Sequence, residues 1–226
     1  MRHQTSGTIA MFALALVGCS ATKPRETAHI LERPSVNVSS DESVTVLLNY
    51  FGLEGRAIAG ELLGCIRGGI RWAHPELRIV PPDEFRRLAF PDLPPEAAPR
   101  SPQFLGMLLD NPVFRDRIAP LNLRYLIAIG GETRVKQSGG AIAGAAPAPA
   151  GAFLFGAWVW NRDTQLVASI LDVKQTGAAA EINAKASGTA WLVLVESLPI
   201  GAPAFTETNA CARLGDKLSQ FLVAPR

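Results

Sequence analysis

Residues 180–187 read AEINAKAS, and this alternation of small apolar and polar side chains decides the fold class. A period of two is typical of a β-strand with one buried face, here with the small residues inward. Further apolar runs predict strands at residues 125–129, 153–160, 166–173 and 191–195. Residues 161–163, Asn-Arg-Asp, are expected to form a short turn, and Gly188 a bulge or turn. The second half of the chain therefore predicts a run of antiparallel strands.

Amphipathic helices are predicted before and after these strands. Apolar stripes at helical spacing cover residues 58–73 and 206–222. Two shorter helices are expected after Ser101-Pro102 and Asn111-Pro112, because each pair places a capping side chain before a proline at the first helical position. Short β-prone runs lie at residues 44–48 and 77–80. The order predicts an α/β domain, with α+β as the alternative, in which helices pack on a mixed, largely antiparallel sheet.

The composition is that of a folded protein of ordinary size. The chain has 226 residues, of which 48% are hydrophobic and 19% charged, enough to bury a core in one domain with appendages. The formal net charge is +2, and no block of like charge occurs. This distribution gives no electrostatic basis for binding nucleic acid.

The first nineteen residues have the pattern of an export signal. Arg2 precedes an apolar run at residues 9–17, which is too short to cross a bilayer of about 30 Å as a helix. The run ends in Leu16-Val17-Gly18-Cys19, which resembles the lipobox of bacterial lipoproteins. The resemblance implies that residues 1–18 are a cleaved signal peptide and that lipid on Cys19 anchors the protein to a membrane, since two or more acyl chains make a durable anchor.

The segment after the lipobox is expected to be a tether. Residues 19–42 are polar and contain Pro24 and Pro34, as in a flexible linker. A single periplasmic domain would then span residues 43–226. In enteric lipoproteins an Asp after the lipidated cysteine favours the inner membrane, so Ser20 favours the outer membrane, facing the periplasm.

The order of elements is similar to that of periplasmic α/β domains in the curli-secretion lipoprotein and in lipoprotein activators of cell-wall synthases. Gly156-Ala157-Trp158, residues 168–172 and Asn209-Ala210-Cys211 also resemble a pattern in uncharacterised proteobacterial envelope lipoproteins. The resemblance implies an envelope protein and brings no catalytic motif. We see none of the long amphipathic hairpin insertions with which the curli-secretion protein builds a pore, so pore formation is not expected.

Cys65 and Cys211 remain in the mature domain if Cys19 carries lipid. Each lies on the apolar stripe of a predicted helix. In an oxidising envelope compartment the two are candidates for one disulfide. The alternative is a pair of buried free thiols, because spacing in the sequence does not reveal the distance between their Cα atoms.

Residues that could carry out chemistry are sparse. His74 is the only histidine in the predicted domain, and its place at a helix end favours a partner for the helix dipole over a catalytic base. A zinc site needs three or four ligands, so we expect no metal and no cofactor. Asp163 and Asp172 are candidates only because they lie near predicted strand ends, where acids are usually turn formers or sheet-edge charges. The sequence contains no nucleophile elbow, Walker A loop or zincin helix.

Two segments are candidates for binding. Trp158 and Trp160 share one face of a predicted strand, as either a sugar- or partner-binding platform or half-buried sheet packing. Residues 137–151 (QSGGAIAGAAPAPAG) lack the side chains for a core and are expected to be a mobile hairpin connection, with a partner-ordered loop as the alternative.

These patterns favour a lipid-anchored, non-enzymatic envelope protein that binds or helps to assemble another envelope protein. A periplasmic hydrolase or transferase with an unrecognised site and a self-assembling structural lipoprotein are the alternatives. The sequence does not determine the oligomeric state.

Overall fold

The computed structural model describes residues 38–49, 55–94, 97–148, 151–175, 177–195 and 198–222. The expected signal peptide, Cys19 and most of the expected tether lie outside these residues. The end of the tether, from residue 38 to 42, is described. Val38 packs against the core, and the side chain of Glu42 is buried. Packing of the domain therefore includes residues just before Ser43.

The centre of the molecule is one six-stranded sheet with the strand order β2-β1-β3-β4-β5-β6. The strands are β1 (Ser43–Leu48), β2 (Arg78–Val80), β3 (Leu123–Ala148), β4 (Gly151–Asp172), β5 (Gly177–Val195) and β6 (Leu198–Ala202). The pairs of β1 with β2 and with β3 are parallel, and the three remaining pairs are antiparallel. The predicted mixed, largely antiparallel sheet is confirmed.

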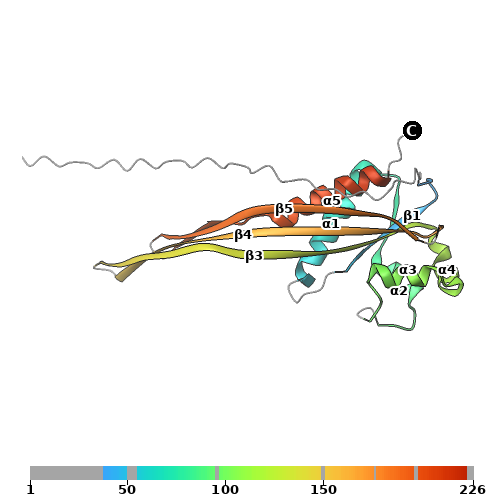
Figure 1. Ribbon diagram of the computed structural model, residues 1–226, viewed down its shortest axis with the longest axis horizontal. Coiled ribbons are helices and arrows are strands. Elements are labelled where there is room, and N and C mark those ends of the chain that lie inside the picture. The colour runs from blue at the N-terminus through green and yellow to red at the C-terminus, as the bar shows by residue number, and fades with distance from the viewer. Residues whose placement is uncertain are drawn as a thin grey trace, which may run out of the picture.

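Helices cover both faces of one end of this sheet (Figure 1). One face carries α1 (Gly55–Ala73) and α5 (Thr206–Leu222). The other carries α2 (Pro82–Ala89), α3 (Pro102–Leu109), α4 (Pro112–Ile118) and a 3-10 turn (Ala119–Leu121). Alternation along β3 divides the two cores, since Ile127 packs with α1 and α5 while Leu126 packs with the short helices. The domain is α/β with helices packed on its sheet.

The short helices begin where their capping residues predict. The Ser101 hydroxyl accepts a hydrogen bond from the Phe104 N–H, and Asn111 Oδ1 accepts one from the Val113 N–H at 2.9 Å. In each case a proline occupies the first helical position, where no N–H is needed.

Two ion pairs fix the end of β4 beside the start of the domain. Arg124 donates to Asp172 at 2.7 Å, and both side chains are buried. The other carboxylate oxygen of Asp172 accepts the N–H groups of Lys174 and Gln175, as expected of a turn former. Lys174 in turn pairs with Glu42. The carboxylate of Asp172 is thus fully engaged in holding the fold.

The strands β3, β4 and β5 continue far beyond the helices (Figure 1). Three sequence expectations were wrong here. Residues 161–163 are not a turn but the middle of β4, and residues 137–148 are not a loop but the end of β3, paired with β4. Gly188 lies inside β5, paired with Arg162. A Cβ on Gly188 would lie 2.9 Å from the Ala204 carbonyl oxygen, so this glycine admits a close approach of the chain.

Candidate interaction surface

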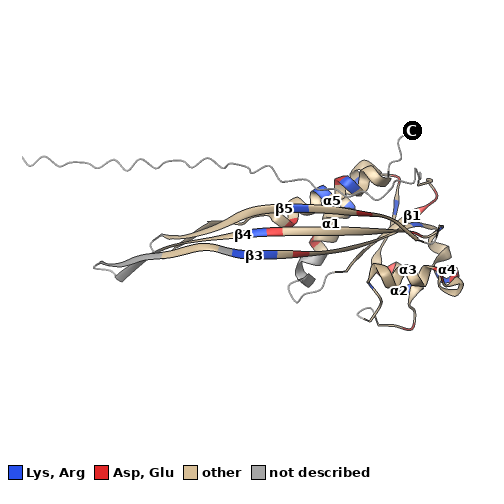
Figure 2. Ribbon diagram, viewed as in Figure 1, with Lys and Arg blue, Asp and Glu red and all other residues tan. Residues whose placement is uncertain are grey.

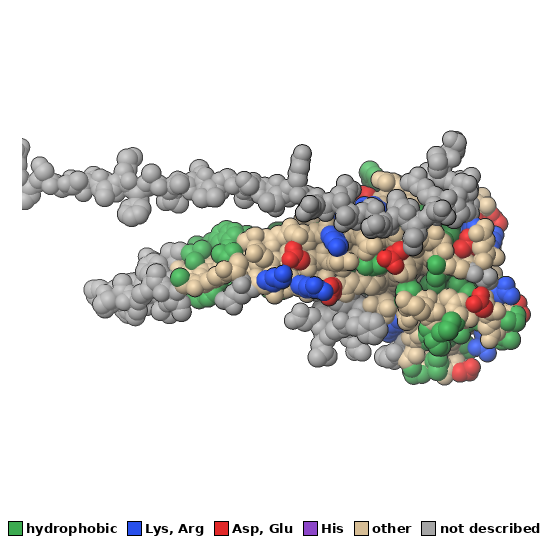
Figure 3. All heavy atoms as spheres, viewed as in Figure 1, with side chains coloured by type: hydrophobic (Ala, Val, Ile, Leu, Met, Phe, Trp, Pro, Cys, Tyr) green, Lys and Arg blue, Asp and Glu red, His purple; other side chains and the backbone are tan. Residues whose placement is uncertain are grey.

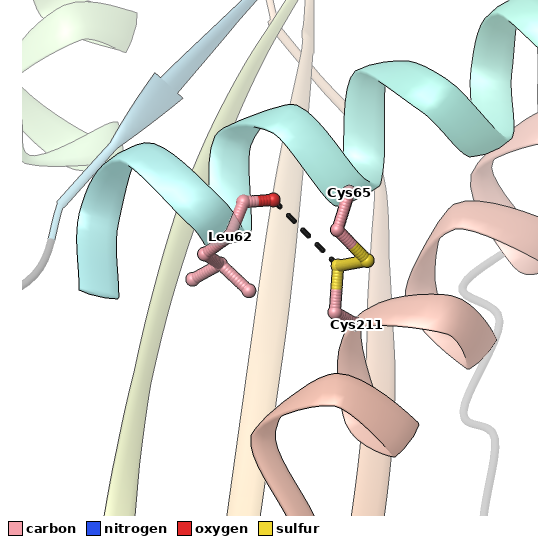
Figure 4. Close-up of a disulfide and its surroundings, with 3 residues drawn as sticks. All are labelled: Leu62, Cys65 and Cys211. Atoms are coloured by element: carbon pink, nitrogen blue, oxygen red, sulfur yellow. Dashed lines mark hydrogen bonds between the residues drawn. A yellow bond between two sulfur atoms is a disulfide. The ribbon is translucent and has the colours of Figure 1, made fainter.

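The disulfide joins the two helices on one face of the sheet (Figure 4). Cys65 of α1 and Cys211 of α5 are bonded, with their Cα atoms 6.4 Å apart and a separation of 146 in the sequence. The Sγ atom of Cys211 lies 3.6 Å from the Leu62 carbonyl oxygen. Because a sulfur in a disulfide carries no hydrogen, this is a contact and not a hydrogen bond. The bond lies between the two helices, with Cys211 buried and Cys65 half-buried, and leaves no free thiol there.

A glycine contact lies one turn further along the same two helices. A Cβ on Gly69 would lie 3.2 Å from the Cα of Gly215, which is tighter than most real contacts. Gly69 follows Cys65 by four residues and Gly215 follows Cys211 by four, so the contact and the disulfide share one helix face. The small residues allow the backbones to approach to the distance that the disulfide spans.

The part of the sheet that the helices do not cover contains no charged residue. We call it the distal sheet, and it consists of residues 137–148 of β3, 151–160 of β4, 189–195 of β5 and 198–202 of β6. The charged residues of β3, β4 and β5 lie before it, as the coloured segments of the ribbon show in Figure 2. Hydrophobic side chains gather over its described part (Figure 3). A protruding sheet without charge is the most unusual surface of the molecule.

A polar collar separates the distal sheet from the helix-covered core. On β3 and β4 it contains Glu132, Arg134, Lys136, Arg162 and Asp163. Arg162 pairs with Glu207 in the first turn of α5 at 2.6 Å, where a carboxylate also suits the helix dipole. The hydroxyls of Thr133, Thr164 and Thr206 form a hydrogen-bonded chain that ends on this carboxylate. These ion pairs and hydrogen bonds link the collar and mark where the covered core ends, although Nε of Arg162 is buried without a hydrogen-bond partner among the described residues.

The first face of the distal sheet carries the two predicted tryptophans. We call it the Trp158 face, and its described side chains include Trp158, Trp160, Leu192 and Leu194, all half-buried. A Cβ on Gly140 or on Gly156 would lie 2.6 Å from atoms of the Trp158 ring. The indole therefore lies flat across two glycines of neighbouring strands, in the arrangement that covers exposed glycine in a sheet. Packing on the sheet explains part of its burial.

The opposite face is more exposed. We call it the Trp191 face, and it includes Val159, Trp191, Val193, Leu198 and Ile200. Trp191 is 42% exposed, Ile200 54% and Leu198 67%. Sequence reasoning did not single out this face, although the consecutive apolar residues 191–195 are a signal for it. A sheet with one face in water alternates polar and apolar residues, whereas a continuous apolar run indicates burial on both faces.

Phe205 adds an unfavourable exposed aromatic at the collar. Its φ is 46°, a left-handed conformation that is uncommon for a bulky residue and costs of order 1 kcal/mol or more. The side chain is 61% exposed just before α5 begins.

The described residues bring no catalytic set together. His74 Nε2 lies 3.1 Å from the Ser219 carbonyl oxygen at the end of α5. It lines an open hollow of about 270 Å³, whose only described acidic lining residue is Glu76. A second open hollow, of about 310 Å³, lies between α3 and the strands β4 and β5. Within the described ranges, no cluster of three His, Cys, Asp or Glu side chains is placed to hold a metal ion.

None of the helices in the described part of the chain is both long enough and apolar enough to cross a membrane.

Comparisons with known proteins give no family. No family model matches the chain, and no curated protein matches it. Among solved structures, the PelC dodecamer from Paraburkholderia phytofirmans has a TM-score of 0.43 and 11% identity, covering 88% of this chain and 99% of that one. A putative neuraminyllactose-binding hemagglutinin homolog from Helicobacter pylori has a TM-score of 0.38 and 7% identity, covering 83% and 86%. Scores this low transfer no property to this chain.

Proposed function

We propose that this chain is a lipid-anchored, non-enzymatic protein of the cell envelope that binds or assembles with other envelope components through its distal sheet. The observation that carries the proposal is the distal sheet itself, which has apolar side chains on both faces and no charge. Contiguous exposed apolar surface on a soluble domain is typical of a binding site. The lipobox-like residues 16–19 support the anchor.

The side chains that could carry out chemistry support a non-enzymatic role by their contacts. Asp172 is held by Arg124 and by two backbone N–H groups. His74 is directed at a helix carbonyl, and Glu207 is paired with Arg162. General acid–base catalysis requires such groups to converge on a substrate site, and here each one serves a structural contact.

The anchor and the distal sheet are compatible in reach. The chain enters the domain at the end of β1 that pairs with Leu123, opposite to the distal sheet. From there to Lys136 at the collar β3 rises roughly 43 Å. The 19 residues from Cys19 to Val38 extend to about 65 Å. A tether of this length can place the distal sheet either close to the membrane or far from it. The reach is therefore compatible with an outer-membrane lipoprotein that faces the periplasm.

The test is formaldehyde crosslinking of the full-length protein in intact cells, followed by mass spectrometry of the adducts. Trp191→Ser and Ile200→Ser alter the most exposed part of the distal sheet without opening the core. Val113→Ser on α4 is the control, because Val113 is similarly exposed at 60% but lies away from this surface. We expect an adduct that both variants lose and the control retains. Adducts that survive both substitutions would refute the distal sheet as the binding surface.

The anchor is tested separately by Cys19→Ala. The variant is expected to leave the membrane fraction, with the signal uncleaved or the protein released. Retention of a mature-sized Cys19→Ala protein in membranes would contradict lipid anchoring at this residue.

A further inference from the structure

Both faces of the distal sheet present apolar side chains. Trp191, Val193 and Ile200 lie on one face, and Trp158 and Leu192 on the other, and the described part of the chain covers neither face. We propose, on the basis of the proposed function, that the distal sheet packs between the distal sheets of two further copies of this chain, the Trp191 face of one on the Trp158 face of the next.

The edges of the distal sheet are poor sites for adding a strand. β3 is an outer strand there, and its register shifts between Gln137 and Gly139 and again between Ile142 and Ala145. On the other edge, β6 is only five residues long and contains Pro199, which has no N–H to donate. Bulges, short strands and prolines are the devices by which sheets prevent edge-to-edge pairing. The faces are therefore the binding surfaces.

Lipid is a poorer occupant of these faces than protein. Within hydrocarbon, the unpaired N–H and C=O groups of both outer edges would each cost several kcal/mol. Residues 137–148 are mostly Gly, Ala and Ser, which gain little from contact with lipid but allow another sheet to approach closely. The sequence also places Glu196 between β5 and β6, where a charge in hydrocarbon is costly.

Symmetry explains why both faces are apolar. A two-fold contact between copies uses the same face twice and leaves the other face of each copy in water. A head-to-tail contact uses a different face on each copy, so every copy in the series has both faces covered. Such contacts close into a ring when the rotation between copies allows it. The apolar character of both faces therefore favours the head-to-tail arrangement.

The size of one contact is small. Four strands about 4.8 Å apart and about seven residues long present roughly 400 Å² per face. A standard stable interface buries about 800 Å² per partner, so one face alone gives a weak pair. Each copy in a series uses both faces, and lipid anchoring confines the copies to one surface and raises their effective concentration. Assembly is accordingly expected on the membrane.

The experiment is formaldehyde crosslinking in intact cells of two coexpressed full-length copies with different tags. Ile200→Lys places a charge on the Trp191 face and Leu194→Lys on the Trp158 face. Val113→Lys on α4 is the matched control, since it adds a charge at a similarly exposed apolar residue. A buried unpaired lysine weakens a contact by more than 1.4 kcal/mol, so each face variant is expected to lose the crosslinked series at least about tenfold.

The head-to-tail contact makes a specific prediction for the mixture. Each lysine variant alone is expected to be monomeric, because every contact needs both faces. Coexpressed, the two variants retain one intact pair of faces and are expected to form dimers that extend no further. If the adduct is a dimer that only one of the two variants loses, the contact is two-fold and the proposal is wrong.

Other outcomes separate this proposal from the proposed function. A series that neither variant changes overturns the role of the distal sheet in self-association. A single adduct with a different protein, lost in both variants, overturns self-association and leaves the proposed function standing. The absence of any adduct that depends on these faces overturns both.

Discussion

Removal of the disulfide is expected to lower the free energy of unfolding substantially. The bond closes a loop across 146 residues of sequence. In the chain-entropy model, a loop of this length restricts the unfolded ensemble by roughly 5 kcal/mol, an upper estimate because unfolded chains retain structure. Measured losses for native disulfides are usually about 2–5 kcal/mol. We expect the double replacement Cys65→Ala and Cys211→Ala to cost about 3–5 kcal/mol.

The assay is equilibrium unfolding in urea with and without reductant. The wild-type protein is expected to shift to a lower midpoint on reduction and to a larger m-value, because the reduced unfolded chain exposes more surface. The double alanine variant is the control, and its unfolding midpoint should not change when reductant is added. Its packing loss is confined to the contact between α1 and α5, where Cys211 is buried and Cys65 half-buried.

Two results would refute this reasoning. One is a wild-type midpoint that does not respond to reductant under denaturing conditions. The other is chemical: protein unfolded without reductant should take up no alkylating agent at Cys65 or Cys211. A mass increase of two alkyl groups in that unreduced sample would show two free thiols.

Three further changes probe the packing and the charges. Arg124→Met leaves the carboxylate of Asp172 buried without its partner and is expected to lower the free energy of unfolding in urea by about 3–5 kcal/mol. Replacing both residues by apolar ones should cost less, and equal losses would contradict a specific ion pair. Burial raises the pKa of Glu42, but its ion pair and a backbone N–H outweigh this and hold the pKa below its ordinary value of 4.5. Its stabilising effect is therefore present above the unfolded-state pKa and lost as pH falls through the folded-state pKa, so Glu42→Gln should flatten the loss of stability between about pH 5 and pH 3; an unchanged profile would exclude this role. Gly68→Ala, in open space on α1, should raise the free energy of unfolding by about 0.5–1 kcal/mol. Gly69→Ala should raise it less or lower it, because the added Cβ meets the backbone of α5. Equal gains in stability would argue against the close contact between the helices.

Periodicity in the sequence predicted the elements that bury one face against a single core. The stripe at residues 58–73 is α1, that at 206–222 is α5, and the caps at Ser101 and Asn111 begin the helices expected of them. The same stripes placed each cysteine on the apolar face of a helix, whereas the pairing of the two helices is seen only in the structure. In each case one buried face repeats with the period of the element, and the sequence records that period.

The long strands could not be predicted for the opposite reason. Asn161, Arg162 and Asp163 are the residues expected of a turn, and nothing local distinguishes a polar turn from a strand that crosses a polar collar. Residues 137–148 have the composition of a loop but are held as a strand by pairing with β4. Both segments depend on partners distant in sequence, which override local preference. The buried partner of Asp172 was missed because β-strand pairing, not spacing, brings Arg124 beside it.

The distance in sequence between α1 and α5 would also set the order of events if the chain is exported as proposed. The two helices pack together, so the face of the sheet that they cover is completed by the last helix to arrive. If the chain crosses a membrane as it is made, at about 5–20 residues per second, Cys65 waits roughly 7–30 s for its partner to emerge. During that time its thiol is open to any oxidant or other cysteine it meets. Correct oxidation of this domain therefore requires Cys65 to stay unmodified until Cys211 arrives, or to be released from any mixed disulfide by attack of the Cys211 thiolate.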